Sequence, residues 1–258
     1  CIKQVPDTEA RIRLKEGVVD LTDVKMVASP FDEFAVEEAI RIKEKTKEGL
    51  ITILCVGSDK AKEAVKWAFS VGADQGCLLK DQAFEGSDTL GIAKILAKAV
   101  EKGDYGLILC GKQAVDDDAA QVGQALAACL DLPHISAVHK LEISDDGTSA
   151  TCHRDIEVGV EVIETSLPAV ITAEKGLNEV RYASLKGIMA AKRKKLEELD
   201  AQALGLDPAD VGLAGAKIVV KELNPPPVRP AGKIVPGDTP EEKVAHLVKM
   251  LHEEAKVI

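Results

Sequence analysis

The chain of 258 residues lacks the features that mark membrane-spanning, secreted and nucleic-acid-binding proteins. No apolar run approaches the roughly 18 residues that a membrane-spanning helix needs. The pattern of the first residues is not that expected of a signal peptide. Basic residues are also scarce, since 33 Lys and Arg stand against 43 Asp and Glu, giving a formal net charge of -10. This balance disfavours a nucleic-acid partner and general binding to a membrane surface.

Known catalytic signatures are missing as well. The sequence contains no G-x-G-x-x-G, no Walker A loop, no G-x-S-x-G and no H-E-x-x-H. The five histidines do not cluster at metal-ligand spacing, and His134 and His139 are expected on opposite sides of one strand. These absences argue against a hydrolase and leave no candidate catalytic or metal-binding residue.

The six cysteines form no C-x-x-C motif. Four of them lie in or beside apolar runs, which predicts buried, reduced thiols and a reducing compartment. The composition, with 46% hydrophobic and 29% charged residues, is that of an ordinary globular protein. The first residues, Cys1 to Val5, are expected to form a strand, and we expect a few residues, including the initiator methionine, to precede it.

Strand-like and helix-like patterns alternate through the first half of the chain. Three apolar runs, 51–56, 76–79 and 107–110, are typical of strands buried on both faces of a sheet. Capping residues predict helices that begin after Ser29, with Pro30 first in the helix, after Ser58, and at Ser87-Asp88. The series predicts an α/β fold with a mostly parallel sheet and flanking helices.

The pattern changes after Pro133. Four strands are expected as an antiparallel extension of the sheet, at 134–143, 150–154, 158–163 and 169–173. A loop at 175–186 and a basic helix at 187–199 follow. We therefore predict a nucleotide-binding α/β domain at 1–200 and an extended proline-rich arm at 201–258. The arm ends in a helix with a capping box at Thr239-Pro240-Glu241-Glu242 and is expected to pack on another subunit.

The most informative segment is the loop from Gly111 to Gly123, which leaves an apolar strand and opens a helix. Such a loop is where α/β proteins bind ligands, because open main-chain N–H groups and the helix dipole attract an anion. Its three consecutive aspartates, Asp116 to Asp118, count against a phosphate. They are expected to cap the helix, accept from ribose hydroxyls or bind a cation, and a solvated capping loop is the plain alternative.

Three other segments carry weaker signals. The turn at Val56-Gly57-Ser58 suits the close approach of an adenosine, although every strand-to-helix unit needs such a turn. The helix start at 27–31 is explained better by simple capping than by a binding role. The basic run at 192–195 fits a solvated helix face, with docking of an acidic partner as the alternative.

Several segments together resemble the β subunit of electron transfer flavoproteins over essentially the whole chain. They are Lys3-Gln4-Val5-Pro6-Asp7, Phe31-Asp32-Glu33-Phe34-Ala35-Val36-Glu37-Glu38-Ala39, Val71-Gly72-Ala73-Asp74, Gly111-Lys112-Gln113-Ala114-Val115-Asp116-Asp117-Asp118, Leu167-Pro168-Ala169-Val170 and Leu177-Asn178-Glu179-Val180-Arg181-Tyr182-Ala183. The resemblance implies an adenine-nucleotide α-hydrolase-like fold and a non-catalytic electron carrier in an obligate heterodimer with an α subunit. That dimer would carry electrons from acyl-CoA dehydrogenases, as in fatty acid oxidation, or from similar flavin dehydrogenases, to a membrane quinone oxidoreductase.

The resemblance also implies cofactors and a location. The redox FAD would lie mainly in the α subunit, and this chain would hold a structural AMP. A bacterial member would be cytoplasmic, and a eukaryotic one would lie in the mitochondrial matrix.

The same resemblance maps functional positions onto this chain. It implies a nucleotide site at Cys1, Ser29, Pro30, Phe31, Asp32, Val56, Gly111, Lys112, Gln113, Ala114, Val115, Asp116, Asp117, Asp118, Ala119, Ala120, Gln121 and Val122. It also implies a dehydrogenase-recognition loop after Arg181, with Arg181 and Tyr182 as partner-binding residues and Leu185 as the hydrophobic anchor. Glu161 is expected to contact the mobile flavin domain of the α subunit.

The chain departs from the family pattern at the phosphate end of this loop. AMP-binding members typically carry Asn and Thr where this chain has Ala120 and Val122, so two side-chain donors are missing. Electron-bifurcating members, which bind a second FAD here, share Ala120-Gln121-Val122-Gly123 but differ at Asp117 and Gln124. We expect AMP, with a second FAD in a bifurcating, NADH-linked protein as the alternative. A stand-alone adenine-nucleotide sensor resembling universal stress proteins is the alternative from another class.

Overall fold

The computed structural model describes residues 1–229 and 231–258, which form two units, Cys1–Glu222 and Leu223–Ile258. The first unit contains a three-stranded parallel sheet made of β12 (Leu196–Leu199), β6 (Gln75–Leu79) and β5 (Thr52–Val56). A five-stranded sheet has the order β10 (Gly159–Ser166), β9 (Ser149–Ile156), β8 (His134–Ile143), β11 (Ala169–Ala173) and β7 (Leu107–Gly111). All four expected strands are present, and β8, β9 and β10 pair antiparallel, which confirms that part of the extension. The strand at 169–173 was expected to be antiparallel as well, but β11 lies parallel to both β7 and β8.

The first two residues join these sheets. The main-chain nitrogen of Cys1 donates to the carbonyl of Leu109 in β7 (2.7 Å), and that of Ile2 donates to Leu54 in β5 (2.9 Å). The strand expected at 1–5 is therefore split, because β1 (Gln4–Pro6) leaves the sheet to pair antiparallel with β4 (Met26–Ala28). Between these two strands, β2 (Arg13–Lys15) and β3 (Val18–Asp20) form a hairpin.

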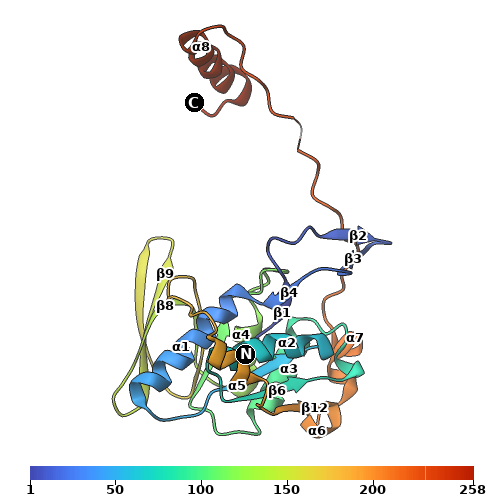
Figure 1. The fold of residues 1–258 in the computed structure, drawn as a ribbon, viewed down its shortest axis with the longest axis vertical. Helices are drawn as coiled ribbons and strands as arrows, with labels where there is room; N and C mark the ends of the chain where they lie inside the picture. The colour runs from blue at the N-terminus through green and yellow to red at the C-terminus, as the bar shows by residue number, and fades with distance from the viewer. Residues whose placement is uncertain (230) are drawn as a thin grey trace. The chain divides into compact units, whose positions relative to one another are not determined.

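Helices cover both faces of the sheet (Figure 1). Alternate residues of a strand point to opposite faces. Leu54 and Ile108 thus pack with α3 (Thr89–Val100) and α4 (Val122–Leu130), while Ile53 packs with α1 (Pro30–Thr46) and α2 (Lys62–Val71). Near-continuous apolar strands are required because neither face meets water. The fold class is the predicted α/β class.

Shorter helical elements complete the first unit. They are η1 (Asp59–Ala61), η2 (Gln82–Phe84), α5 (Leu185–Ala191), α6 (Ala201–Leu204), η3 (Pro208–Asp210) and α7 (Gly212–Gly215). Residues 201–222, which the sequence assigned to the arm, belong to this unit. Ala201, Leu204 and Val211 are buried in the core that α3 covers, so this segment is part of the first unit and not of an extended arm.

The prediction of one basic helix over residues 187–199 is wrong. The helix α5 ends at Ala191, and residues 196–199 form strand β12, parallel to β6. Leu196 packs on one core cluster and Leu199 on another. Residues three apart cover opposite faces in a strand but the same face in a helix, which explains the outcome. The basic run lies between the two elements, where the Lys194 amino group donates to the Ala73 carbonyl.

The predicted helix starts at Ser29 and Ser87-Asp88 are confirmed, whereas Ser58 precedes the 3-10 turn η1 without a side-chain cap and α2 begins only at Lys62. Asp88 caps α3 by accepting from the Gly91 N–H (2.9 Å). Ser29 precedes α1, but its carbonyl rather than its hydroxyl accepts from the first turn, and the buried hydroxyl has no partner in the described part of the chain. All six cysteines are free, and burial raises the pKa of Cys55 to about 12, so this thiol is unreactive.

The second unit contains the helix α8 (Pro240–Met250), which continues as a π-helical turn, Leu251–Ala255. The predicted capping box is present, since Thr239 accepts from the Glu242 N–H and the Glu242 carboxylate accepts from the Thr239 N–H. Of the proline-rich run, Pro230 lies outside the described residues. Across the ranges 1–229 and 231–258, no helix is long and apolar enough to cross a membrane.

Candidate functional site

A cavity of about 240 Å³ lies at the carboxyl ends of β5 and β7. Twelve of the expected nucleotide-site residues line it: Cys1, Asp32, Val56, Gly111, Lys112, Gln113, Ala114, Asp117, Ala119, Ala120, Gln121 and Val122. Six others do not line it: Ser29, Pro30, Phe31, Val115, Asp116 and Asp118. The loop from Gly111 to Gly123 thus forms one wall of a real cavity, at the edge of the sheet where α/β proteins bind ligands.

The Asp32 carboxylate joins the first residues of the chain to the end of β7 at this edge of the sheet. It lies in the first turn of α1 and accepts from the main-chain N–H groups of Lys3 (2.7 Å) and Gly111 (2.9 Å). A Cβ atom on Gly111 would lie 2.4 Å from Asp32 Oδ1 and 2.7 Å from the carbonyl carbon of Phe31, so this position requires glycine. Burial raises the pKa of Asp32 to about 6, against the effect of its two hydrogen bonds.

The three aspartates of the loop are occupied within the protein. The Lys3 amino group bonds Asp116 Oδ1 (2.8 Å) and Asp117 Oδ2 (3.0 Å). Burial lowers the pKa of Lys3, but these two hydrogen bonds outweigh it and leave the pKa above its usual value. Asp118 accepts from the Gln113 amide (2.7 Å). The aspartates therefore shape the loop, and in the described ranges no acidic, His or Cys group is arranged to hold a metal ion.

Within residues 1–229 and 231–258, the main-chain donors at the start of α4 have no side-chain cap from Gln121. The helix begins directly after this residue, at Val122. The first N–H groups of such a helix have no intrahelical acceptor, and the helix dipole adds positive potential there. Asp118 and Ala120 both have φ of +50°, a left-handed conformation that side chains other than glycine rarely adopt. Strain of this kind is typical of ligand-binding loops.

The structure adds residues that the sequence reasoning missed. Ser87, Asp88 and Thr89 at the start of α3 line the cavity, and Ile92 and Leu96 of the same helix give it an apolar floor. The Thr89 hydroxyl donates to the Gln121 side chain (2.8 Å) and so ties α3 to the loop. The capping signal at Ser87-Asp88 was visible in the sequence, but nothing local indicated that this helix start faces the same cavity as α4.

Asp88 has a second role at the edge of the cavity. Besides capping α3, its carboxylate accepts from the N–H groups of Lys217 (2.6 Å) and Ile218 (3.2 Å). The hydrogen bond from the Gly91 N–H, followed by those from Lys217 and Ile218, holds the pKa of Asp88 below its usual value. One ionised side chain thus connects the cavity to the last residues of the first unit.

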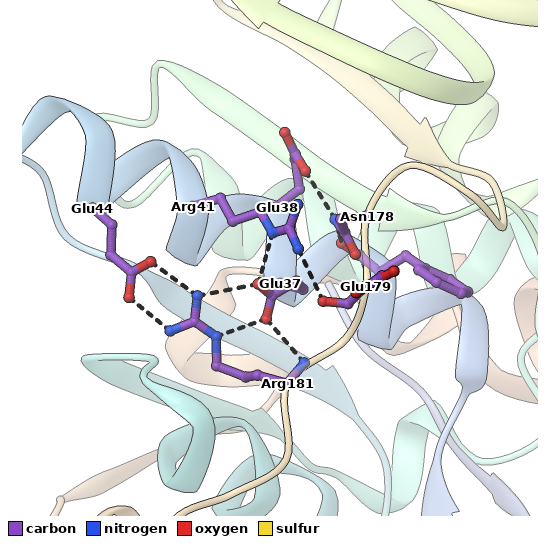
Figure 2. A network of polar contacts seen from close by, with 8 residues as sticks. Glu37, Glu38, Arg41, Glu44, Asn178, Glu179 and Arg181 are labelled. Atoms are coloured by element: carbon purple, nitrogen blue, oxygen red, sulfur yellow. Dashed lines mark hydrogen bonds and ion pairs between the residues drawn. The ribbon is translucent and has the colours of Figure 1, made fainter.

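The expected recognition loop is anchored at one end and exposed beyond it. The Arg181 guanidinium bonds the carboxylates of Glu37 (2.8 Å) and Glu44 (2.7 Å), as Figure 2 shows. Arg181 therefore binds α1 rather than facing outward. Tyr182 is 98% exposed and Leu185, the first residue of α5, is 77% exposed. Two large apolar side chains thus stand in solvent next to a fixed arginine.

Glu161 lies on β10, the edge strand of the larger sheet. Its carboxylate is half-exposed and lies 3.2 Å from Arg154 Nε on the neighbouring strand. Val158, Val160 and Val162 along the same edge are exposed as well. Because alternate residues of a strand point to opposite faces, Glu161 and its two neighbours Val160 and Val162 lie on opposite faces of this edge strand.

The parallel sheet with a cavity at its carboxyl edge and an open helix start places the molecule among ligand-binding α/β proteins. The sequence profile of the electron transfer flavoprotein domain matches residues 16–204. The chain is 40% identical over 258 residues to "Electron transfer flavoprotein subunit beta" of Bacillus subtilis, covering 100% of this chain and 98% of that one. The chain belongs to the electron transfer flavoprotein β-subunit family, whose members are electron carriers.

Two further relatives show the breadth of the similarity. The protein of the same name from Bos taurus is 40% identical over 252 residues, covering 95% of this chain and 94% of that one. The "Caffeyl-CoA reductase-Etf complex subunit CarD" of Acetobacterium woodii is 36% identical over 256 residues, covering 98% and 97%.

Proposed function

We propose that the chain is the β subunit of a heterodimeric electron transfer flavoprotein that holds a structural AMP and supports an FAD in its α subunit. The dimer accepts electrons from flavin dehydrogenases of the acyl-CoA type and passes them to a membrane quinone oxidoreductase. The observation that carries the proposal is the cavity beside the 111–122 loop, in a chain whose family carries electrons.

The residues around the cavity fit an adenine nucleotide monophosphate. The open N–H groups at Val122 and Gly123 suit a phosphate, because the aspartates of the loop are already occupied by Lys3 and Gln113. The apolar surface of Val56, Ile92 and Leu96 suits a purine ring. The nucleotide would serve structurally, since it would join α3, α4 and the loop.

A bifurcating protein with a second FAD in this cavity is the alternative. Ala120 and Val122 offer no side-chain donor to a phosphate, so the main chain must bind it alone, and main-chain donors accept a monophosphate or a diphosphate. The name of the Acetobacterium woodii relative also places that protein in a complex with a CoA-ester reductase. This alternative predicts that NADH reduces the dimer directly.

Two parts of the surface are proposed to bind partners. The exposed segment around Tyr182 and Leu185 docks the dehydrogenase, because apolar side chains presented from a fixed backbone make strong interface anchors. The second unit, Leu223–Ile258, packs on the α subunit, because Val244, Leu247 and Val248 of α8 form an exposed apolar stripe. Truncation after residue 222 is expected to lower the yield of heterodimer and to spare the nucleotide site.

Electron transfer tests the proposal directly. The chain is co-expressed with its cognate α subunit, and the purified dimer is mixed with an acyl-CoA dehydrogenase and its substrate. We expect a yellow dimer whose flavin is reduced by the dehydrogenase and reoxidised by the quinone oxidoreductase, with no reduction by NADH alone. Reduction by NADH would favour the bifurcating alternative, and a colourless chain that binds no α subunit would contradict both.

A further inference from the structure

We infer that Arg181 is a positioning residue for partner docking: through its clamp on α1 it holds the exposed segment Tyr182–Leu185 in the conformation that the dehydrogenase binds. The inference rests on the proposed function of that segment. It adds that the affinity for the dehydrogenase depends on buried and half-buried ion pairs that never touch the partner.

The clamp joins one face of α1 to the chain just before the exposed segment (Figure 2). Residues three, four and seven positions apart on a helix lie on the same face. That face presents Phe34, Glu37, Glu38, Arg41 and Glu44 to residues 178–181. Asn178 donates to the Glu38 carboxylate (2.8 Å) and to the Phe34 carbonyl (3.0 Å), and Arg41 donates to the Glu179 carbonyl (3.1 Å).

Arg181 is held both by its main chain and by its side chain. Glu37 Oε2 accepts from the Arg181 main-chain N–H (3.3 Å) and from its Nε (2.8 Å), which fixes the backbone as well as the guanidinium. Glu44 receives two bonds from the guanidinium, of 2.7 and 2.9 Å. The Glu37 side chain is only 3% exposed, and Arg41 pairs with its other side (2.9 Å). A planar, forked cation is needed to bridge two carboxylates in this way, and lysine cannot replace it.

The far end of the segment is anchored separately. Ser184 caps α5 by accepting from the Gly187 N–H (3.0 Å). A Cβ atom on Gly187 would lie 2.1 Å from the Ser70 carbonyl oxygen, so α5 is pressed against the end of α2. Ala183 packs on the core between the two anchors. Tyr182 and Leu185 therefore project from a short bridge that is fixed on both sides.

This arrangement has a consequence for binding. A segment that is already ordered loses less conformational entropy when a partner docks than a free loop does. Release of the Arg181 end would free the backbone of two or three residues, and ordering each of them again costs a factor of several in affinity. We expect the electron-transfer step itself not to change, because Glu37, Glu44 and Arg181 do not line the cavity beside the 111–122 loop.

The test compares variants of the whole heterodimer as acceptor for the dehydrogenase. Arg181→Gln removes the fork, Glu44→Gln removes only its outer carboxylate, which is 59% exposed, and Glu48→Gln changes a nearby exposed glutamate as the control. We expect Arg181→Gln to raise the KM for the heterodimer about tenfold, with kcat within about twofold. Arg181→Lys and Glu44→Gln should give smaller increases, and Glu48→Gln none.

Hydrogen exchange and one further variant separate the outcomes. We expect the amides of residues 182–185 to exchange faster in Arg181→Gln, while flavin and nucleotide contents stay at the wild-type level. Faster exchange with an unchanged KM would overturn the inference, as would a fall in kcat alone. Leu185→Ala tests the proposed docking itself: if it raises KM and the clamp variants do not, only the present inference fails. If Leu185→Ala and Tyr182→Ala both leave KM unchanged, the proposed docking surface fails.

Discussion

The helix α1 supports two regions of the molecule, the cavity edge at Gly111 and the exposed segment Tyr182–Leu185. Both are held by a carboxylate of this helix, but they differ in the groups that they leave without a partner. At its first turn, Asp32 accepts from the main chain of Lys3 and Gly111 and fixes the edge of the cavity. Further along, Glu37 accepts from the main chain of Arg181 and fixes the base of the exposed segment. In both regions a carboxylate of the helix holds a distant strand or loop in place.

The difference lies in what each region leaves without a partner. The cavity leaves N–H groups at the start of α4 open, so it favours a small anionic ligand. The segment leaves Tyr182 and Leu185 in solvent, so it favours a protein surface. One scaffold helix thus serves a nucleotide site and a docking site, and changes at either end should act on one of them alone.

Gly111→Ala should have the largest effect, because it should disrupt the contact between Gly111 and the first turn of α1 at the edge of the cavity. The added Cβ would meet the main chain of Phe31 and Asp32 at 2.7 Å, where nothing can move aside. We expect a loss of about 3 kcal/mol in the free energy of unfolding, together with loss of the bound nucleotide. Thermal unfolding and nucleotide analysis measure both. Gly106→Ala, at a glycine with nothing within 4 Å, is the control and should be neutral.

Asp32→Asn should follow, because an amide can accept from only one of the two N–H groups that the carboxylate now binds. We expect a loss of about 2 kcal/mol from the unsatisfied donor, measured by urea denaturation. Asp104→Asn, at an exposed aspartate, is the matched control. An unchanged midpoint in Asp32→Asn would show that this carboxylate does not join the strands.

The same residue predicts a pH dependence. The pKa of Asp32 rises from 3.8 to about 6 through burial, so the folded state holds this proton more tightly than the unfolded state. Its contribution to stability is present below pH 3.8 and is lost as the pH rises to about 6. Urea midpoints measured across this window should fall for the wild type more than for Asp32→Asn. Equal slopes would contradict the assignment.

The clamp should titrate in the opposite direction. Burial raises the pKa of Glu37, but the bonds from Arg181 and Arg41 outweigh it, so the pKa lies below its ordinary 4.5. A lowered pKa gives a contribution that is complete above pH 4.5 and lost as the pH falls through the lower folded value. Protection factors for residues 181–185 should therefore drop below pH 4.5. If protection there is constant to pH 3, the ion pairs do not hold the segment.

Ala120→Gly should have the smallest effect, and it should be stabilising. Ala120 has φ of +50°, a conformation that costs alanine about 1–2 kcal/mol, while glycine loses about 0.5–1 kcal/mol more backbone entropy on folding. The balance predicts a gain of about 0.5 kcal/mol in calorimetric stability. Ala128→Gly, on the exposed face of α4, should instead cost about 1 kcal/mol. A loss at both positions would mean that the left-handed conformation carries no strain.

The sequence predicted the local features of both regions and missed what joins them. Apolar runs predicted the central strands, and capping residues predicted where α1, α3 and α8 begin. The partners of the three aspartates could not be predicted, because Lys3 lies 113 residues from Asp116 and only the fold brings them together.

The docking segment shows the same limit. Exposure of Tyr182 and Leu185 agrees with the expected loop, but nothing in the sequence indicated that Arg181, where the loop begins, pairs with Glu37 on α1. The prediction for residues 187–199 was wrong because the local pattern fits two structures. A basic run at 192–195, with Ile188 and Met189 before it and Leu196 and Leu199 after it, fits one helix as well as a turn followed by a strand. Pairing of β12 with β6 decides between them, and that pairing is not encoded locally.

The nucleotide content of the purified heterodimer tests the central claim most directly. Denaturation releases the bound cofactors, and chromatography counts AMP and FAD per dimer. The account predicts one AMP and one FAD, with the AMP missing from a Gly111→Ala dimer that keeps its FAD. Two FAD and no AMP would contradict the assignment of AMP to this cavity, and one FAD with no second nucleotide would contradict a nucleotide site in this chain.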